Sequence, residues 1–155
     1  MRVRHTRNYA TTPDRLWASA VDLADLRTVC RGLIGFDDRV PATGRIHEGD
    51  VFVTDVRLFG RLPAQTYRMD VAELSDRDRR FRSEESGAGV TRWSHVCTVT
   101  QTATGARLTD SIDIEAGAMT PLMALWARLL YHIRGRRRAA LVEGAALPPD
   151  PAPPR

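Results

Sequence analysis

Residues 90–99 have the sequence VTRWSHVCTV, and residues 107–114, after a turn near Ala103, have the sequence RLTDSIDI. Successive side chains of a strand point to opposite faces, so a tight hairpin of these two runs has two distinct faces. The predicted register pairs Val99 with Leu108, Cys97 with Asp110, His95 with Ile112, and Trp93 with Ile114. The opposite face carries the polar residues Ser94, Thr98, Thr109, Ser111, Asp113 and Glu115, so the first face is predicted to be buried.

Two polar residues, His95 and Asp110, fall on the predicted inner face and are diagonal neighbours within reach of each other. A buried carboxylate is costly unless it is paired. Two interpretations follow: the pair is purely structural, or it lines a cavity and binds the polar end of a ligand. The pair resembles part of a catalytic dyad, although no nucleophile is evident. Cys97 points the same way, but a buried cysteine is usually an inert small hydrophobe.

The stretches around this hairpin also have the composition of strands. Strands are predicted at 35–40, 50–59, 63–73, 80–85, 90–102 and 106–116, with turn residues at the breaks. Links this short favour an antiparallel meander. Within 63–73, Met69 and Val71 are assigned to the inner face, which places Tyr67 inside and Arg68 outside.

The N-terminal segment predicts one strand followed by two short helices. Residues 3–9 alternate loosely between apolar and polar and form the strand. Thr12 is a good N-cap and Pro13 suits the first helical position. Leu16 and Trp17 then begin a buried helix face, and a second short helix ends near residues 30–32.

A long amphipathic helix follows the last strand. Thr120 is its predicted N-cap, Pro121 lies in its first turn, and one apolar stripe contains Leu122, Leu125, Trp126, Leu129, Leu130, Ile133 and Leu141. A sheet with one apolar face needs a cover, and this helix is the only candidate of matching length. The predicted fold class is therefore α+β, a helix-grip fold with a curved antiparallel sheet of about seven strands around the C-terminal helix. Residues 1–144 form this domain, and the proline-rich residues 145–155 form a disordered tail.

The 155 residues carry a net charge of +4, and every basic side chain is an arginine. Most of these arginines alternate with acidic residues, which is typical of a solvated surface. The exception is the group of Arg134 and Arg136–Arg138 near the end of the last helix. Either these cations complement the helix dipole, or they meet an anionic partner.

Several classes of protein are not expected. No apolar run approaches the ~20 residues of a membrane-spanning helix, and the charged N-terminus has no apolar segment behind it, so neither membrane insertion nor a signal peptide is predicted. Cys30 and Cys97 lack metal-like spacing and are interpreted as reduced thiols of a cytoplasmic protein. The remaining histidines, His5, His47 and His132, are scattered. No metal site and no cofactor are predicted, and a nucleic-acid partner is not favoured.

The combined pattern resembles the START-like superfamily, also called SRPBCC, which includes pollen-allergen-like proteins and polyketide cyclases. The resemblance covers about residues 3–143. It is carried by the order of elements, the opening helix Thr12-Pro13-x-x-Leu16-Trp17, the Trp93-x-His95 strand, the Thr109-Asp110 strand, and the long final helix with its arginine-rich end. Bacterial members with Trp-x-His on one strand are the most similar.

This resemblance implies a deep hydrophobic cavity between the sheet and the C-terminal helix. Members bind lipids, sterols, aromatic polyketides or plant hormones there, and some catalyse cyclisation or dehydration. Trp93, His95 and Asp110 occupy family-pattern positions, while Trp17 and Trp126 lie on the two helices that usually close the pocket. The predicted ligand-binding residues are Trp17, Tyr67, Trp93, His95, Cys97, Asp110 and Trp126.

Three functions remain open, and the first is preferred. The chain is a non-catalytic protein that binds a small hydrophobic ligand, lipid-like or aromatic. Alternatively, it is a cyclase or dehydratase with His95 as general acid or base, Asp110 orienting it, and Tyr67 as a third polar group. As a third alternative, it is a protein- or RNA-interaction module that uses the segment from Arg134 to Arg138. A homodimer is compatible with each of them.

Overall fold

The computed structural model of this chain describes residues 1–58 and 63–144. In these segments the elements are β1 (Arg2–Tyr9), α1 (Pro13–Val21), α2 (Leu23–Cys30), β2 (Ile34–Phe36), β3 (Val51–Leu58), β4 (Gln65–Ser75), β5 (Arg80–Gly87), β6 (Val90–Thr102), β7 (Gly105–Glu115), the short 3-10 helix η1 (Gly117–Met119) and α3 (Thr120–Val142). This is the predicted order of one strand, two short helices, a run of strands and one long helix. The predicted tail, residues 145–155, lies outside the described residues.

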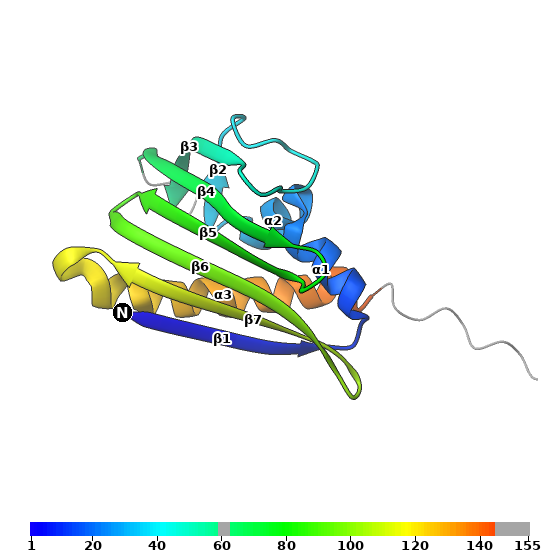
Figure 1. The fold of residues 1–155 in the computed structure, drawn as a ribbon. Coiled ribbons are helices and arrows are strands. Elements are labelled where there is room, and N and C mark those ends of the chain that lie inside the picture. The colour runs from blue at the N-terminus through cyan, green and yellow to red at the C-terminus, as the bar shows by residue number, and fades with distance from the viewer. Residues whose placement is uncertain (59–62, 145–155) are drawn as a thin grey trace, which may run out of the picture.

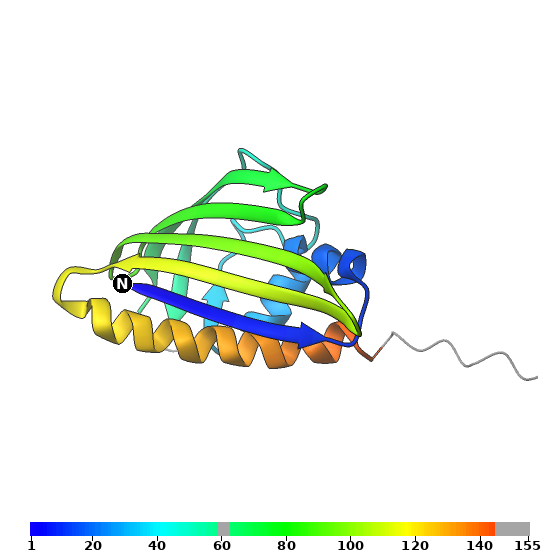
Figure 2. The same ribbon diagram turned by 60° about the horizontal axis from the view of Figure 1, so that its bottom comes forward.

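The seven described strands form one antiparallel sheet in the order β1-β7-β6-β5-β4-β3-β2. The sheet curls, and α3 runs along its inner side close to β1, while α1 and α2 lie at one end (Figures 1 and 2). The predicted helix-grip fold is confirmed. Among the helices in the described segments, none is long and apolar enough to cross a membrane.

The hairpin of β6 and β7 has the predicted register. Its pairs include Val99 with Leu108, Cys97 with Asp110, His95 with Ile112, and Trp93 with Ile114. All eight of these side chains are buried. The alternation of the two runs was therefore sufficient to place His95 and Asp110 inside the protein.

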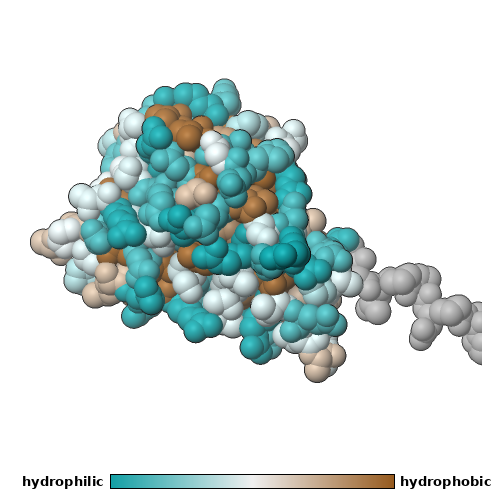
Figure 3. All heavy atoms as spheres, viewed as in Figure 1, coloured by the Kyte–Doolittle hydropathy of each residue, from teal (hydrophilic) through white to brown (hydrophobic). Residues whose placement is uncertain are grey.

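The outer face of the sheet is polar and carries ion pairs within and between neighbouring strands. Arg82 pairs with both Glu73 and Glu84, and Arg92 also pairs with Glu84. The side of the molecule seen in Figure 3 is accordingly mostly hydrophilic, with small apolar patches. Ser94 on this outer face is only 8% exposed, contrary to prediction. Its hydroxyl donates to Glu84 Oε1 at 2.8 Å, so the ion-pair network takes the place of solvent.

The predicted N-cap is correct for α1 and wrong for α3, although Pro121 lies in the first turn of α3 as predicted. Thr12 Oγ1 accepts a backbone N–H of the first turn, and Pro13 is the first residue of α1. α3 begins at Thr120 itself, because η1 leads directly into it. The Thr120 hydroxyl instead accepts the backbone N–H of Ala116 at 2.9 Å, so it fixes the turn after β7.

The buried face of α3 differs from the predicted leucine stripe. Leu122, Leu125 and Leu129 are 52%, 61% and 47% exposed. The helix buries smaller and more mixed residues: Ala124, Ala127, Leu130, Tyr131, Gly135, Arg138, Ala139 and Val142. A Cβ added to Gly135 would lie 2.9 Å from Cε1 of His5 on β1. Because α3 packs close to the sheet, the helix face that meets the sheet carries small side chains. A prediction based on apolar residues alone therefore identified the wrong face of α3.

Candidate functional site

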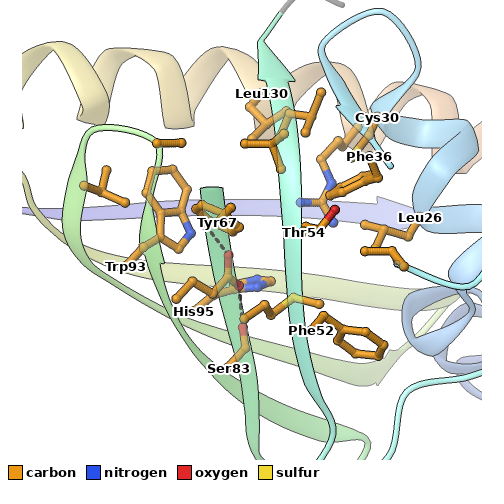
Figure 4. A pocket seen from close by; sticks show the side chains of 18 of the residues that line it. Leu26, Cys30, Phe36, Phe52, Thr54, Tyr67, Ser83, Trp93, His95 and Leu130 are labelled. Carbon is orange, nitrogen blue, oxygen red and sulfur yellow. Dashed lines mark hydrogen bonds between the residues drawn. The ribbon is translucent and has the colours of Figure 1, made fainter. Parts of the chain in front are cut away.

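A cavity lies between the concave face of the sheet, α2 and α3 (Figure 4). The cavity has a volume of about 120 Å³. This is roughly ten times the volume that one water molecule needs on the same measure. Alternate residues of β3, β4, β5 and β6 point into it. Its wall is mainly apolar and includes Leu26, Phe36, Phe52, Val71, Phe81, Trp93, Trp126 and Leu130. Besides Thr54, whose hydroxyl donates to Asp37, three polar groups interrupt the described part of this wall.

The first polar group is the buried pair of His95 and Asp110. Nε2 of His95 lies 2.8 Å from Oδ1 of Asp110, and the two side chains are 5% and 10% exposed. Burial alone would raise the pKa of Asp110, but the hydrogen bond and charge of His95 outweigh it and hold that pKa below its ordinary value. Asp110 is therefore ionised at neutral pH and can only accept, so Nε2 of His95 carries the hydrogen.

Aromatic neighbours fix the imidazole of His95 in the cavity wall. The ring centroids of Phe81 and Tyr131 lie 5.3 Å and 5.2 Å from that of His95. His95 lines the cavity, whereas Asp110 does not. Nδ1 of His95 has no hydrogen-bond partner among the residues that the structure describes. A bound molecule could therefore reach this nitrogen.

The second polar group is centred on the carboxylate of Glu85 on β5. The hydroxyls of Tyr67 and Ser83 both donate to it, and Ser83 reaches Oε1 at 2.6 Å, as the dashed lines in Figure 4 show. Burial, reinforced by the negative charge of Glu85, raises the pKa of the Tyr67 hydroxyl well above its ordinary value. Tyr67 thus stays protonated and keeps its hydrogen bond at physiological pH.

The third polar group is Arg134, the only arginine on the described part of the cavity wall. It lies one helical turn after Leu130 on α3, so the two side chains share a face. Its guanidinium carbon lies 4.8 Å from the ring centre of Tyr131, which is a cation–π contact. A permanent positive charge thus stands in a mainly apolar cavity.

Comparison with known sequences gives a family. Residues 10–141 match the sequence profile of the family described as "Domain of unknown function (DUF8410)". The chain belongs to this family. No curated protein matches the sequence.

Solved structures similar to this DUF8410 chain share its fold at low identity. Protein CV1439 from Chromobacterium violaceum is 18% identical, with a TM-score of 0.71 over 92% of this chain and 98% of that one. A START superfamily protein from Mycobacterium smegmatis is 12% identical, with a TM-score of 0.66 over 92% and 97%. DynU16, from the dynemicin biosynthetic locus, is 17% identical, with a TM-score of 0.61 over 87% and 46%. The fold of the DUF8410 chain is thus START-like, as the sequence resemblance implied.

Four of the seven predicted ligand-binding residues line the cavity of the DUF8410 chain. They are Tyr67, Trp93, His95 and Trp126. Asp110 reaches the cavity only through His95, and Cys97 also lies outside the wall. Burial, together with the charge of Asp110, raises the pKa of the Cys97 thiol well above its ordinary value. That thiol stays protonated and is poorly suited to nucleophilic catalysis.

Trp17 does not line the cavity but belongs to the core between α1 and the sheet. Its ring packs against Phe81 at 6.3 Å between centroids, and its Nε1–H donates to Oδ1 of Asp76 at 2.7 Å. α2 supplies the cavity wall at this end through Leu26 and Cys30. The resemblance therefore indicated the correct end of the pocket but the wrong helix.

Sequence reasoning missed Glu85, Ser83 and Arg134. Ser83 and Glu85 alternate with Phe81 on a strand that was predicted, but its inner face was not assigned. Arg134 follows Leu130 by four residues and Trp126 by eight, a spacing that places all three on one helix face. It was instead grouped by charge with the arginines that follow it.

The arginines that follow Arg134 do not form a solvated cluster. Arg137 donates to the carbonyls of Val29 and Arg31, at 3.0 Å and 2.5 Å. Arg138 is 5% exposed and donates to the carbonyl and hydroxyl of Ser19, at 2.5 Å and 2.9 Å. These contacts tie α3 to α1 and α2. The helix-dipole interpretation is wrong, because α3 continues to Val142 and its last turn holds no basic residue.

Metal-binding side chains do not converge in the described segments. His5 and His132 lie close, with 6.4 Å between ring centroids. Within residues 1–58 and 63–144, however, no group of three or more His, Cys, Asp or Glu could hold a metal ion. Both cysteines are free and buried, as predicted.

Proposed function

We propose that this chain binds a small hydrophobic molecule, lipid-like or aromatic, in the cavity between the sheet and α3. The observation that carries the proposal is an apolar cavity of about 120 Å³ with a few polar groups on its wall. Such a combination is typical of small-molecule sites. Leaving this space empty costs roughly 24 cal/mol per Å³ of cavity, or about 3 kcal/mol here. A ligand that fills it recovers part of that free energy.

The START-like fold of the structural neighbours supports this proposal at the level of architecture. Fold alone does not define function. The stronger support is local, because aromatic and aliphatic side chains from the strands, α2 and α3 converge on one space. Tyr67, Trp93, His95 and Trp126 are the sequence-predicted residues that we assign to ligand contact.

Native mass spectrometry of purified protein tests the proposal. Wild-type protein is expected to carry an additional mass that leaves on denaturation. Val56→Phe should lose it, because Val56 lines the cavity and is 4% exposed. Val53→Phe is the matched control on the same strand, since Val53 is 41% exposed and lies outside the wall. If both variants retain the same bound mass as the wild type, the molecule binds elsewhere.

General acid–base catalysis is the second candidate function, and the geometry of His95 favours it. One ring nitrogen is held by Asp110, and the other has no partner among the described residues, in a cavity that also contains Tyr67. A cyclase or dehydratase could use such an imidazole. The His95→Gln variant separates the two candidates. If the protein is a catalyst, His95→Gln should retain bound substrate that the wild type converts, so the masses bound to the two proteins should differ. If it is a carrier, both proteins should show the same bound mass.

The interaction-module hypothesis has little support in the described residues. It required a basic surface from Arg134 to Arg138. Arg134 lines the cavity, and Arg137 and Arg138 are engaged with α2 and α1. Arg136 alone of these side chains is exposed.

A further inference from the structure

Arg134 differs from the other inward-facing arginines of α3 in having no hydrogen-bond acceptor among the described residues. Arg137 and Arg138 each donate to backbone carbonyls within 3.0 Å. Among residues 1–58 and 63–144, Arg134 makes no hydrogen bond and no ion pair, and its contact with the ring of Tyr131 supplies no hydrogen-bond acceptor. A guanidinium presents five N–H donors and remains charged in proteins. Its donors are thus available to a molecule in the cavity.

The two carboxylates near Arg134 are already engaged by other donors. Glu85 accepts from Tyr67 and Ser83, and Asp110 accepts from His95. Both act on Arg134 through space, but neither forms an ion pair with it. The Arg134 side chain is partly buried and lines the cavity. Burying a charge without a hydrogen-bonded partner is costly, so a bound anion would stabilise this arrangement.

We propose that Arg134 binds the carboxylate of an amphipathic monocarboxylic acid whose hydrocarbon body fills the cavity. This inference rests on the proposed function and specifies the chemical class of its ligand. A planar carboxylate matches the guanidinium fork, because two parallel N–H···O bonds can form. A singly charged head group is preferred over a phosphate, because Arg134 is the single arginine of the described wall and Glu85 disfavours further negative charge.

The test compares an acid with the alcohol of equal chain length. Isothermal titration calorimetry with decanoate and with decan-1-ol is performed on protein whose native mass shows no bound molecule. Wild-type protein should bind decanoate at least tenfold more tightly than decan-1-ol, because hydrogen bonds to charged groups are worth about tenfold to a hundredfold in affinity. Arg134→Gln should remove this preference and leave binding of the alcohol within about twofold.

Arg136→Gln is the matched control, since Arg136 lies two residues further along α3 and is exposed. It should bind both probes as the wild type does. Equal affinity of the wild type for acid and alcohol overturns the carboxylate assignment but leaves the cavity as a hydrophobic site. Failure of the wild type to bind either probe overturns both proposals. The wild-type comparison alone decides the matter if Arg134→Gln does not fold.

Discussion

Replacing Asp110 with alanine leaves His95 buried without its hydrogen-bond acceptor. The pair is 2.8 Å long, and its side chains are 5% and 10% exposed, so solvent has little access to the vacated position. If the imidazole is neutral, the cost is that of an unsatisfied buried N–H, about 1–3 kcal/mol. If it keeps a charge, the cost is that of breaking a buried ion pair, about 3–5 kcal/mol. We expect Asp110→Ala to lower the free energy of unfolding by about 3 kcal/mol, where these ranges meet.

Asp113 on the same strand provides a matched control. Its ion pair with Arg2 is also 2.8 Å long, but the Arg2 and Asp113 side chains are 73% and 45% exposed. Water and salt screen such a pair, so Asp113→Ala should cost far less than Asp110→Ala. Urea denaturation at pH 7, followed by circular dichroism, measures both. Equal losses for the two variants would refute the argument that burial makes the His95–Asp110 pair structurally important.

Three further predictions concern other parts of the argument. Leu130→Ala should cost about 2–5 kcal/mol of unfolding free energy, because this side chain is 3% exposed. Leu125→Ala should stay within about 0.5 kcal/mol, because its side chain is 61% exposed; similar losses in urea titrations would contradict the observed orientation of α3. The pKa of Asp110 in the folded protein lies below its ordinary value. The ionised Asp110 carboxylate therefore stabilises the folded protein at pH values above the unfolded pKa of about 3.9, and this stabilisation is lost as the pH falls through the folded pKa. Wild-type stability should therefore fall more steeply than that of Asp110→Asn below about pH 4 in acid titrations followed by circular dichroism, and parallel curves would count against it. Binding of decanoate should change tryptophan emission in Trp17→Phe as in the wild type, because Trp93 lines the cavity and Trp17 does not; loss of the signal in that variant would place the ligand near α1.

The fold was predictable because its decisive signal is local. The period-two pattern of residues 90–114 fixed the register of β6 and β7 without tertiary information. The same parity argument placed Tyr67 inside and Arg68 outside on β4, as the structure has them. The buried face of α3 was not predictable in this way. Ala124, Ala127, Ala139 and Gly135 are inside because of the distance between helix and sheet, and no sequence pattern reports that distance.

On the strands, the candidate site was predicted only where an inner face had already been assigned, whereas Trp126 on α3 came from the family resemblance. His95 and Trp93 were found because hydrophobic neighbours on both strands fixed their orientation. Glu85 was missed because β5 is rich in polar residues on both faces, so its alternation gives no contrast. Arg134 was missed because it was interpreted together with the neighbouring Arg136–Arg138 as one basic group with a single role. The four arginines after Ile133 have separate environments, since successive helical residues are turned by about 100°.

The polar groups of the cavity fall into two kinds, those that already have hydrogen-bond partners within the protein and those that do not. His95 and Asp110 satisfy one another except at Nδ1, and Glu85 is held by two hydroxyls. Removing either arrangement should therefore affect stability as well as binding. Arg134 has no such internal partner in the described residues, so its replacement by glutamine should change ligand preference with little loss of stability. A variant that loses decanoate binding without a lower unfolding midpoint would thus distinguish a ligand-binding residue from a structural one.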